Sequence, residues 1–97
     1  MIPCLLRSKA QNDLEDIADF TLEKWSKDQE KIYLRMLQRS FEALSKNPNL
    51  GRPFDSIMPD LRQLFAGRHI ILYFTTQTHI DIVRILHCLV PWCDVLD

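Results

Sequence analysis

Hydrophobic residues recur every three to four positions through the first half of the chain, in two successive runs. This spacing places apolar side chains on one face of a helix. The stripe of the first run comprises Leu14, Ile17, Ala18, Thr21, Leu22 and Trp25. The stripe of the second run comprises Ile32, Tyr33, Met36, Leu37, Ser40, Phe41 and Leu44. We therefore predict two amphipathic helices that pack through these stripes.

Polar motifs mark the ends of both predicted helices. SKAQ from Ser8 and SKDQ from Ser26 have the serine-to-glutamine spacing of a capping box, which satisfies two backbone N–H groups at a helix start. The second helix is predicted to end at Asn47-Pro48, because proline keeps the preceding residue out of helical geometry. Few residues join the two helices, so we expect an antiparallel helical hairpin.

The hydrophobic period changes to two after a proline-rich segment, residues 47–59, which we predict to be a loop. Strands are predicted over residues 61–65, 68–76 and 79–90, and a short first strand over residues 2–7. Very short turns join the last three strands, which favours an antiparallel meander. The central strand is apolar on both faces, so the helices should cover one face, and the C-terminal tail or a partner the other.

An N-terminal strand, a helical hairpin and a three-stranded antiparallel meander predict a single α+β domain of two layers over residues 1–97. No apolar stretch approaches the ~20 residues needed to cross a bilayer. Near the N-terminus the basic residues follow the apolar patch, whereas a secretory signal has the opposite order. We therefore expect a cytoplasmic protein that does not contact membranes.

The charge distribution argues against a surface built for nucleic acid. The net charge is −1, and the second half of the chain holds four of the 12 basic residues, namely Arg52, Arg62, Arg68 and Arg84. A nucleic-acid-binding protein usually carries a basic stripe. We therefore expect no direct sequence-specific binding of nucleic acid by this chain alone.

The three cysteines do not predict a disulfide framework or a metal site. Their number is odd and they form no CxxC pair. His87, Cys88 and Cys93 are the nearest approach to a ligand set, but adjacent strand residues point to opposite faces and cannot easily share one ion. We expect neither a metal nor another cofactor.

The last predicted strand contains IDIVRILH, residues 80–87, in which an arginine and a histidine stand among aliphatic residues. Simple alternation puts Arg84 in one row with Ile80 and Ile82, and His87 in the other row. A buried guanidinium without a partner is costly, so Arg84 should meet a carboxylate or backbone carbonyls, or open into a cleft that reaches water. A lone histidine at a strand end more often lies at the rim of a fold than in a catalytic site.

Three stretches in this order, NPNLGRP, GRHIILYF and IDIVRILH, make the chain resemble the ParE branch of the ParE/RelE toxin superfamily. The resemblance covers essentially the whole chain and implies the RelE/ParE-like two-layer fold. It also implies a small toxin encoded with a labile antitoxin in a type II toxin–antitoxin operon, of the kind linked to plasmid or chromosomal stability. ParE-like proteins are associated with trapping DNA gyrase on broken DNA, whereas their RelE relatives cleave mRNA at the ribosome.

Two features of the sequence favour the ParE branch over the RelE branch. RelE-like enzymes typically carry a basic residue three positions before the central-strand tyrosine, but here Ile70 stands three before Tyr73. The basic loop lysines of those enzymes also have no counterpart, because residues 47–59 contain Arg52 as their one basic residue. RNA cleavage needs an acid, a base and cations against the phosphate. We therefore favour a gyrase inhibitor that acts by binding.

Two other functions stay open. The first is a RelE-type ribosome-dependent mRNA endonuclease that uses Arg84 and His87 as catalytic residues. The second is an inactive remnant, or a module that its antitoxin sequesters without toxicity.

A toxin that acts by binding is expected to use interface anchors, for which arginine and aromatic residues are the usual choice. The candidate partner-binding residues are Arg52, Arg62, Arg68, Arg84, His87 and Trp92. Trp92 belongs to an apolar tail, LVPWCDVL, which either folds back over the open sheet face or contacts a partner. The partners implied by the resemblance are DNA gyrase and a cognate antitoxin, whose extended segment would wrap the toxin in a hetero-oligomeric complex.

Overall fold

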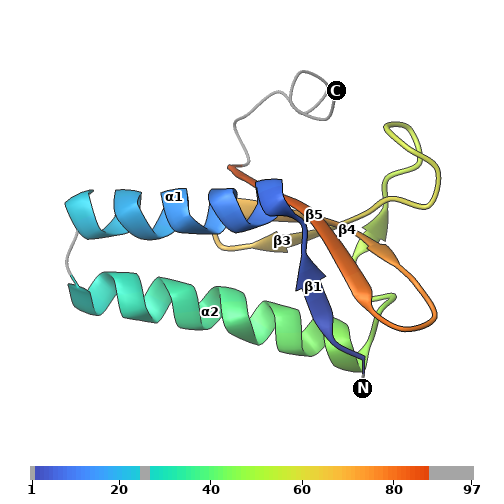
Figure 1. Cartoon of the computed structure of the whole chain (residues 1–97), viewed down its shortest axis with the longest axis horizontal. Coiled ribbons are helices and arrows are strands. Elements are labelled where there is room, and N and C mark those ends of the chain that lie inside the picture. The colour runs from blue at the N-terminus through green and yellow to red at the C-terminus, as the bar shows by residue number, and fades with distance from the viewer. Residues whose placement is uncertain (1, 25–26, 88–97) are drawn as a thin grey trace.

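Two helices pack on one face of a mixed β-sheet in the computed structural model, which describes residues 2–24 and 27–87 (Figure 1). The helices are α1, Ser8–Lys24, and α2, Lys27–Lys46. The strands are β1, Cys4–Leu6; β2, Arg52–Pro53; β3, Arg62–Ala66; β4, His69–Thr75; and β5, Ile80–His87. The α+β class, both helices and the antiparallel meander β3-β4-β5 agree with the prediction from the sequence.

The sheet contains two pairings that the sequence pattern did not predict. Its strand order is β1-β5-β4-β3-β2. β1 runs parallel to β5, with Cys4 opposite Ile80, and β2 runs antiparallel to β3, with Arg52 opposite Gln63. β2 lies inside the segment predicted to be a loop, and its two residues are too few to show an alternating pattern.

The first helix begins at Ser8 as predicted, but not through the predicted capping box. The N–H of Gln11 donates to the carbonyl of Arg7 at 2.9 Å, so Ser8 already lies inside the helix. The side-chain amide of Gln11 donates to the carbonyl of Leu6 at 3.3 Å instead of reaching Ser8. The second predicted box begins at Ser26, which lies outside the described residues.

The larger hydrophobic core lies between the helices and the sheet. The helices contribute Ala10, Ile17, Leu37 and Leu44 to it, and the sheet contributes Ala66, Ile71, Tyr73, Ile80, Ile82 and Ile85. Each large apolar side chain buried in this way stabilises the fold by about 1.5–3 kcal/mol. Trp25 of the first predicted stripe lies outside the described part of the chain, as do the side chains of Thr21 and Leu22.

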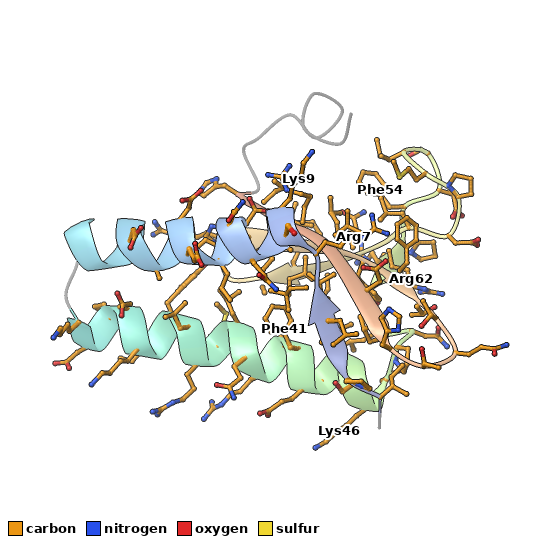
Figure 2. All side chains as sticks on the ribbon, viewed as in Figure 1. Arg7, Lys9, Phe41, Lys46, Phe54 and Arg62 are labelled. Carbon is orange, nitrogen blue, oxygen red and sulfur yellow. The ribbon has the colours of Figure 1, made fainter. Side chains whose placement is uncertain are left out.

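A second, smaller core lies on the opposite face of the sheet. Its buried residues are Leu61, Ile70, Leu72 and Leu86, and Phe54, Ile57 and Phe74 pack against them. Phe54, labelled in Figure 2, comes from the loop that precedes β3. The loop itself is ordered by backbone bonds, since the N–H of Phe54 donates to the carbonyl of Leu61 at 2.7 Å. Residues 54–61 therefore cover this face in a place where we had expected only the C-terminal tail or a partner.

β5 contains a bulge in its middle. Leu72 of β4 lies opposite Arg84, but the next residue, Tyr73, lies opposite Ile82. Val83 is therefore an extra residue on β5, which is the definition of a β-bulge.

The bulge reverses the alternation of side chains along β5. Ile82 and Ile85 both belong to the core beneath the helices, whereas Leu86 belongs to the second core. Arg84 therefore shares a face with Leu86 and not with Ile82, so the predicted row was wrong from the bulge onward. His87 shares the helix-facing side with Ile85.

No helix within residues 2–24 and 27–87 is long and apolar enough to cross a membrane. In the same ranges, no three His, Cys, Asp or Glu side chains gather in a way that could hold a metal ion.

Candidate functional site

Arg84 is bound by a carboxylate, which is one of the partners that the cost of a buried charge led us to expect. Its Nε donates to Oδ2 of Asp13 at 2.8 Å, and its Nη2 donates to Oδ1 at 2.9 Å. The two side chains are only 17% and 13% exposed. This bidentate contact raises the pKa of Arg84 above its ordinary value, against the opposing effect of burial. The guanidinium is therefore a fixed cation.

The same carboxylate closes an open edge of the sheet. β1 covers the edge of β5 as far as Ile82, whose carbonyl accepts from the N–H of Arg7 at 3.0 Å. Beyond that point the N–H of Ile85 donates to Oδ2 of Asp13 at 3.0 Å. Asp13 thus takes the place of a neighbouring strand, and it joins α1 to β5 through both a side chain and the backbone.

A second polar group lies on the helix-facing side of the sheet. His69 on β4 stands opposite His87 on β5, with ring centroids 5.5 Å apart and ring planes at 83°. Nδ1 of His69 is hydrogen-bonded to the hydroxyl of Tyr33 on α2. The same hydroxyl accepts the N–H of Arg68 at 3.2 Å. Tyr33 therefore fastens α2 to the turn between β3 and β4.

This environment favours the neutral form of His69. Burial lowers its pKa below the ordinary value, and the neighbouring His87 lowers it further. Asp13 acts in the opposite direction but has the smallest effect of the three.

The loop after α2 is held by Tyr73 from the central strand. The buried hydroxyl of Tyr73 accepts the N–H of Gly51 at 2.8 Å and donates to the carbonyl of Pro48 at 3.0 Å. A Cβ at position 51 would lie 2.6 Å from that hydroxyl and 2.7 Å from the carbonyl of Gln63, so only glycine fits. Arg62 completes the arrangement by donating to the carbonyl of Gly51 at 2.7 Å.

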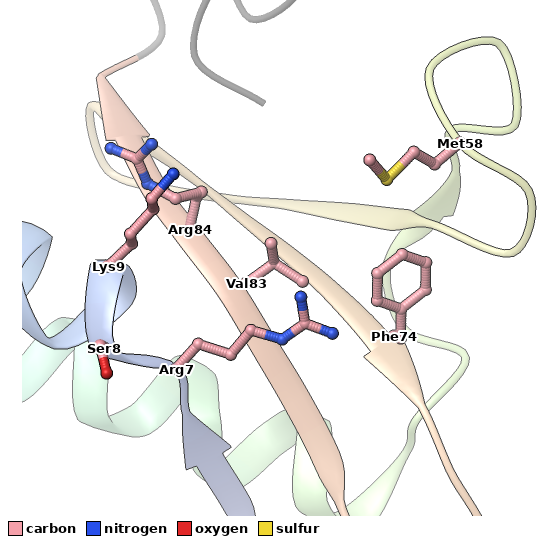
Figure 3. A pocket seen from close by; sticks show the side chains of 7 residues that line it. All are labelled: Arg7, Ser8, Lys9, Met58, Phe74, Val83 and Arg84. Carbon is pink, nitrogen blue, oxygen red and sulfur yellow. The ribbon is translucent and has the colours of Figure 1, made fainter. Parts of the chain in front are cut away.

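A pocket of about 340 Å³ opens beside β5 (Figure 3). It is lined by Arg7, Ser8, Lys9, Met58, Phe74, Val83 and Arg84. Figure 3 shows Lys9 and Arg84 at one end of it, the Arg7 guanidinium directed towards Phe74, and Met58 reaching in from the loop. The Arg7 guanidinium carbon lies 5.9 Å from the centroid of the Phe74 ring. The pocket thus combines cationic groups with an apolar wall.

The structure separates the residues predicted to bind partners. Arg52 is exposed on β2 at one edge of the sheet. Arg62, on the adjoining β3, donates a hydrogen bond to the Gly51 carbonyl. Arg68 is exposed in the turn between β3 and β4. Arg84 and His87 lie at the far end of β5 but leave the strand on opposite faces. Trp92 lies outside the described residues.

The residues that complete these groups were not singled out from the sequence. Helical periodicity tells only which side of a helix a residue occupies, so it placed Tyr33 in an apolar stripe and did not single out Asp13. His69 lies 18 positions before His87, so the histidine pair depends on strand register. Lys9 and Arg7 gave no signal beyond their charge.

Comparison with known proteins shows which family this fold and these residues represent. The model of the family described as "ParE toxin of type II toxin-antitoxin system, parDE" matches residues 5–89. The chain is 44% identical to Toxin ParE1 of Mycobacterium tuberculosis over 84 residues, which is 86% of each chain. It is 30% identical to Toxin ParE1 of Caulobacter vibrioides over 87 residues, which is 90% of each chain.

A solved structure supports the fold independently. A chain described as "Chromosomal ParDE TA system from P. aeruginosa" superposes with a TM-score of 0.77 at 21% identity, over 90% of this chain and 96% of that one. The family match, both relatives and the shared two-layer fold agree with the resemblance noted in the sequence. This chain belongs to the ParE toxin family of type II toxin–antitoxin systems.

Proposed function

We propose that this chain is a toxin that inhibits DNA gyrase by binding to it, so that replication is blocked, and that a cognate antitoxin neutralises it. Membership of the ParE family supports the toxin role. The observation that carries the choice of binding over RNA cleavage is the pairing of Arg84 with Asp13.

An endonuclease would need the Arg84 guanidinium to face the phosphate that it cleaves. Here its Nε and Nη2 both point at Asp13, which also holds the backbone of Ile85. Freeing the guanidinium would leave a partly buried carboxylate unpaired and would weaken the attachment of α1 to β5. Arg84 therefore serves the fold, and the toxin acts through its surface.

The position that carries a cation in RelE-like enzymes also differs. Ile70, three residues before Tyr73, is fully buried in the second core. A charged side chain could not take its place there without disrupting the packing under residues 54–61.

An antitoxin partner fits both the comparisons and the surface. The structural relative comes from a ParDE toxin–antitoxin system, which supports a cognate antitoxin here as well. Several large apolar side chains are exposed, namely Leu5, Ile32, Leu50, Met58 and Phe65. An extended antitoxin segment that folds on binding would bury such residues. The proposal places the complex in the cytoplasm, where gyrase acts on DNA.

Two assays with the purified protein test this function together. In the first, gyrase supercoils relaxed plasmid in the presence of the toxin; we expect supercoiling to fall and cleaved DNA to accumulate. In the second, ribosomes translate a reporter mRNA, which we expect to stay intact. A toxin that leaves gyrase unaffected and cuts the message in the ribosomal A site would refute the proposal.

One observation favours the endonuclease alternative, and it can be tested separately. His69 and His87 lie side by side on neighbouring strands with their rings edge to face, so two groups of the type used for general acid–base catalysis lie together. If the chain cuts mRNA, His87→Gln and the charge-conserving Arg84→Lys should each abolish cutting while the protein stays folded. Under our proposal neither variant has an mRNA cleavage activity to lose.

A further inference from the structure

A pocket lies between the start of α1, β5 and the loop before β3. Its volume of about 340 Å³ falls within the ~300–1,000 Å³ common for ligand pockets. The bulge at Val83 and the first turn of α1 form one side of it, and Met58 of the loop forms the other (Figure 3). It is therefore assembled from three parts of the chain.

Among the residues that the structure describes, the cations around the pocket outnumber their acidic partners by one. Three cations line it, and none of its described lining residues is acidic. Arg7 is already paired with Asp81, at 2.7 Å, and Arg84 with Asp13, at 2.8 Å. Lys9 forms no ion pair within the described part of the chain. One positive charge, at the N-terminal end of a 17-residue helix whose first turn contains no acidic residue, thus has no counter-ion among residues 2–24 and 27–87.

The remaining wall is apolar and partly open to solvent. Phe74 and Val83 are half-buried, and Met58 is 37% exposed. Methionine adapts its shape to different contacts, and an aromatic ring offers a large apolar surface. A ligand that buried these three side chains would gain hydrophobic free energy in addition to the contact with Lys9.

We propose that this pocket binds a short segment of the antitoxin in which an acidic residue stands next to a bulky apolar one. The carboxylate would pair with Lys9, and the apolar side chain would lie against Phe74, Val83 and Met58. The identity of this occupant rests on the proposed function. A single uncompensated charge matches one carboxylate, whereas a nucleic acid strand presents a row of phosphates and needs several cations.

Lys9→Glu is the variant that tests the proposal. A carboxylate in the first turn of α1 interacts favourably with the helix dipole, so the variant is expected to fold at least as well as the parent. Lys31→Glu makes the same charge change at an exposed position on α2 and serves as the matched control. Thermal unfolding of both variants confirms that they are folded.

The binding partner in the experiment is the protein encoded in the reading frame adjacent to this chain's gene, which is the expected antitoxin. We expect Lys9→Glu to raise the Kd of the toxin–antitoxin complex at least tenfold, and Lys31→Glu to change it less than twofold. Equal Kd values for the parent and Lys9→Glu, or no complex with the parent toxin, would overturn the proposal.

A second measurement locates the contact. With ¹³C-methyl-labelled methionine, the methyl resonance of Met58 should shift when the antitoxin is added, and this shift should be weaker for Lys9→Glu at the same concentrations. A complex that leaves the Met58 resonance unchanged would overturn the proposal. So would a single-stranded oligonucleotide that shifts it at lower concentration than the antitoxin, because the pocket would then be a nucleic acid site.

Failure of this proposal can be told apart from failure of the proposed function. Inhibition of gyrase by the parent toxin is measured in parallel. A toxin that inhibits gyrase but binds the antitoxin without using Lys9 would refute the pocket assignment alone. A toxin that has no effect on gyrase but binds the antitoxin through Lys9 would refute gyrase as the target and leave the pocket assignment standing.

Discussion

Tyr73 shows how one hydroxyl can fix a loop motif. Burial raises the pKa of this phenol, so it stays protonated and can donate to Pro48 while it accepts from Gly51. The stretch NPNLGRP therefore has a structural reason: its glycine leaves room for the hydroxyl, and its backbone supplies both hydrogen-bond partners. Tyr73 and Gly51 are 22 residues apart in the sequence. The hydroxyl accounts for the glycine in the loop, and the loop backbone accounts for the hydrogen bonds of the hydroxyl.

We predict that Tyr73→Phe destabilises the protein although it removes one atom. The buried N–H of Gly51 would lose its acceptor, which typically costs about 1–3 kcal/mol. Urea denaturation followed by circular dichroism measures the change. Tyr33→Phe is a control of the same chemistry at a half-buried site and should cost less. An unchanged midpoint for Tyr73→Phe would mean that the loop does not depend on this hydroxyl.

His69 gives the stability of the fold a defined pH dependence. Its pKa is lowered in the folded protein, so between that value and the ordinary pKa of about 6.5 the unfolded chain binds more protons. This contribution is therefore present above pH 6.5 and is lost as the pH falls through the folded pKa. We predict that the free energy of unfolding declines less steeply from pH 7 to pH 5 in His69→Gln than in the parent.

Urea titrations at several pH values measure that slope. His79→Gln, at the other end of the meander, is the matched histidine control. A parent and a His69→Gln variant with the same slope would contradict the assignment of the lowered pKa to this residue.

At the scale of the elements, two ion pairs connect N-terminal residues to β5, and they differ in burial. Arg7 and Asp81 are 54% and 20% exposed, whereas Arg84 and Asp13 are 17% and 13% exposed. Asp13 also accepts the N–H of Ile85. The attachment of α1 to the open edge of β5 therefore depends mainly on Asp13.

We predict that Asp13→Ala costs about 3 kcal/mol, because it removes the carboxylate that neutralises a largely buried guanidinium. Asp81→Ala should cost less than about 1 kcal/mol, as is usual for a pair with an exposed partner. Denaturant unfolding of both variants gives the comparison. Equal losses for the two variants would show that Asp13 has no special role at the edge of the sheet.

The sequence predicted the helices and strands in which hydrophobic residues recur with a regular period. The prediction failed for features that depend on pairing between distant segments. Both helices and the three meander strands follow from runs of five or more residues. The parallel partner of β1, the two-residue β2 and the bulge at Val83 depend on contacts between distant segments. Arg84 was expected to have an acidic partner, but Asp13 is 71 residues away and only the fold brings them together.

At the scale of the whole molecule, the two faces of the sheet are covered in different ways. The helices bury one face, and residues 54–61 cover part of the other. The pocket lined by Arg7, Lys9 and Arg84 opens beside that loop. The exposed apolar residues and this pocket are the surfaces to which we propose that partners bind.

The most direct test of that claim is a titration of gyrase–DNA cleavage complexes with the toxin at fixed gyrase concentration, with a reporter mRNA translated in parallel at the same toxin concentrations. If the toxin acts by binding gyrase, the amount of cleaved DNA should rise with toxin concentration and saturate as gyrase becomes occupied. It should return to baseline when the antitoxin is added in excess. A flat response from gyrase, together with catalytic loss of the mRNA at toxin concentrations far below that of the ribosomes, would contradict the account.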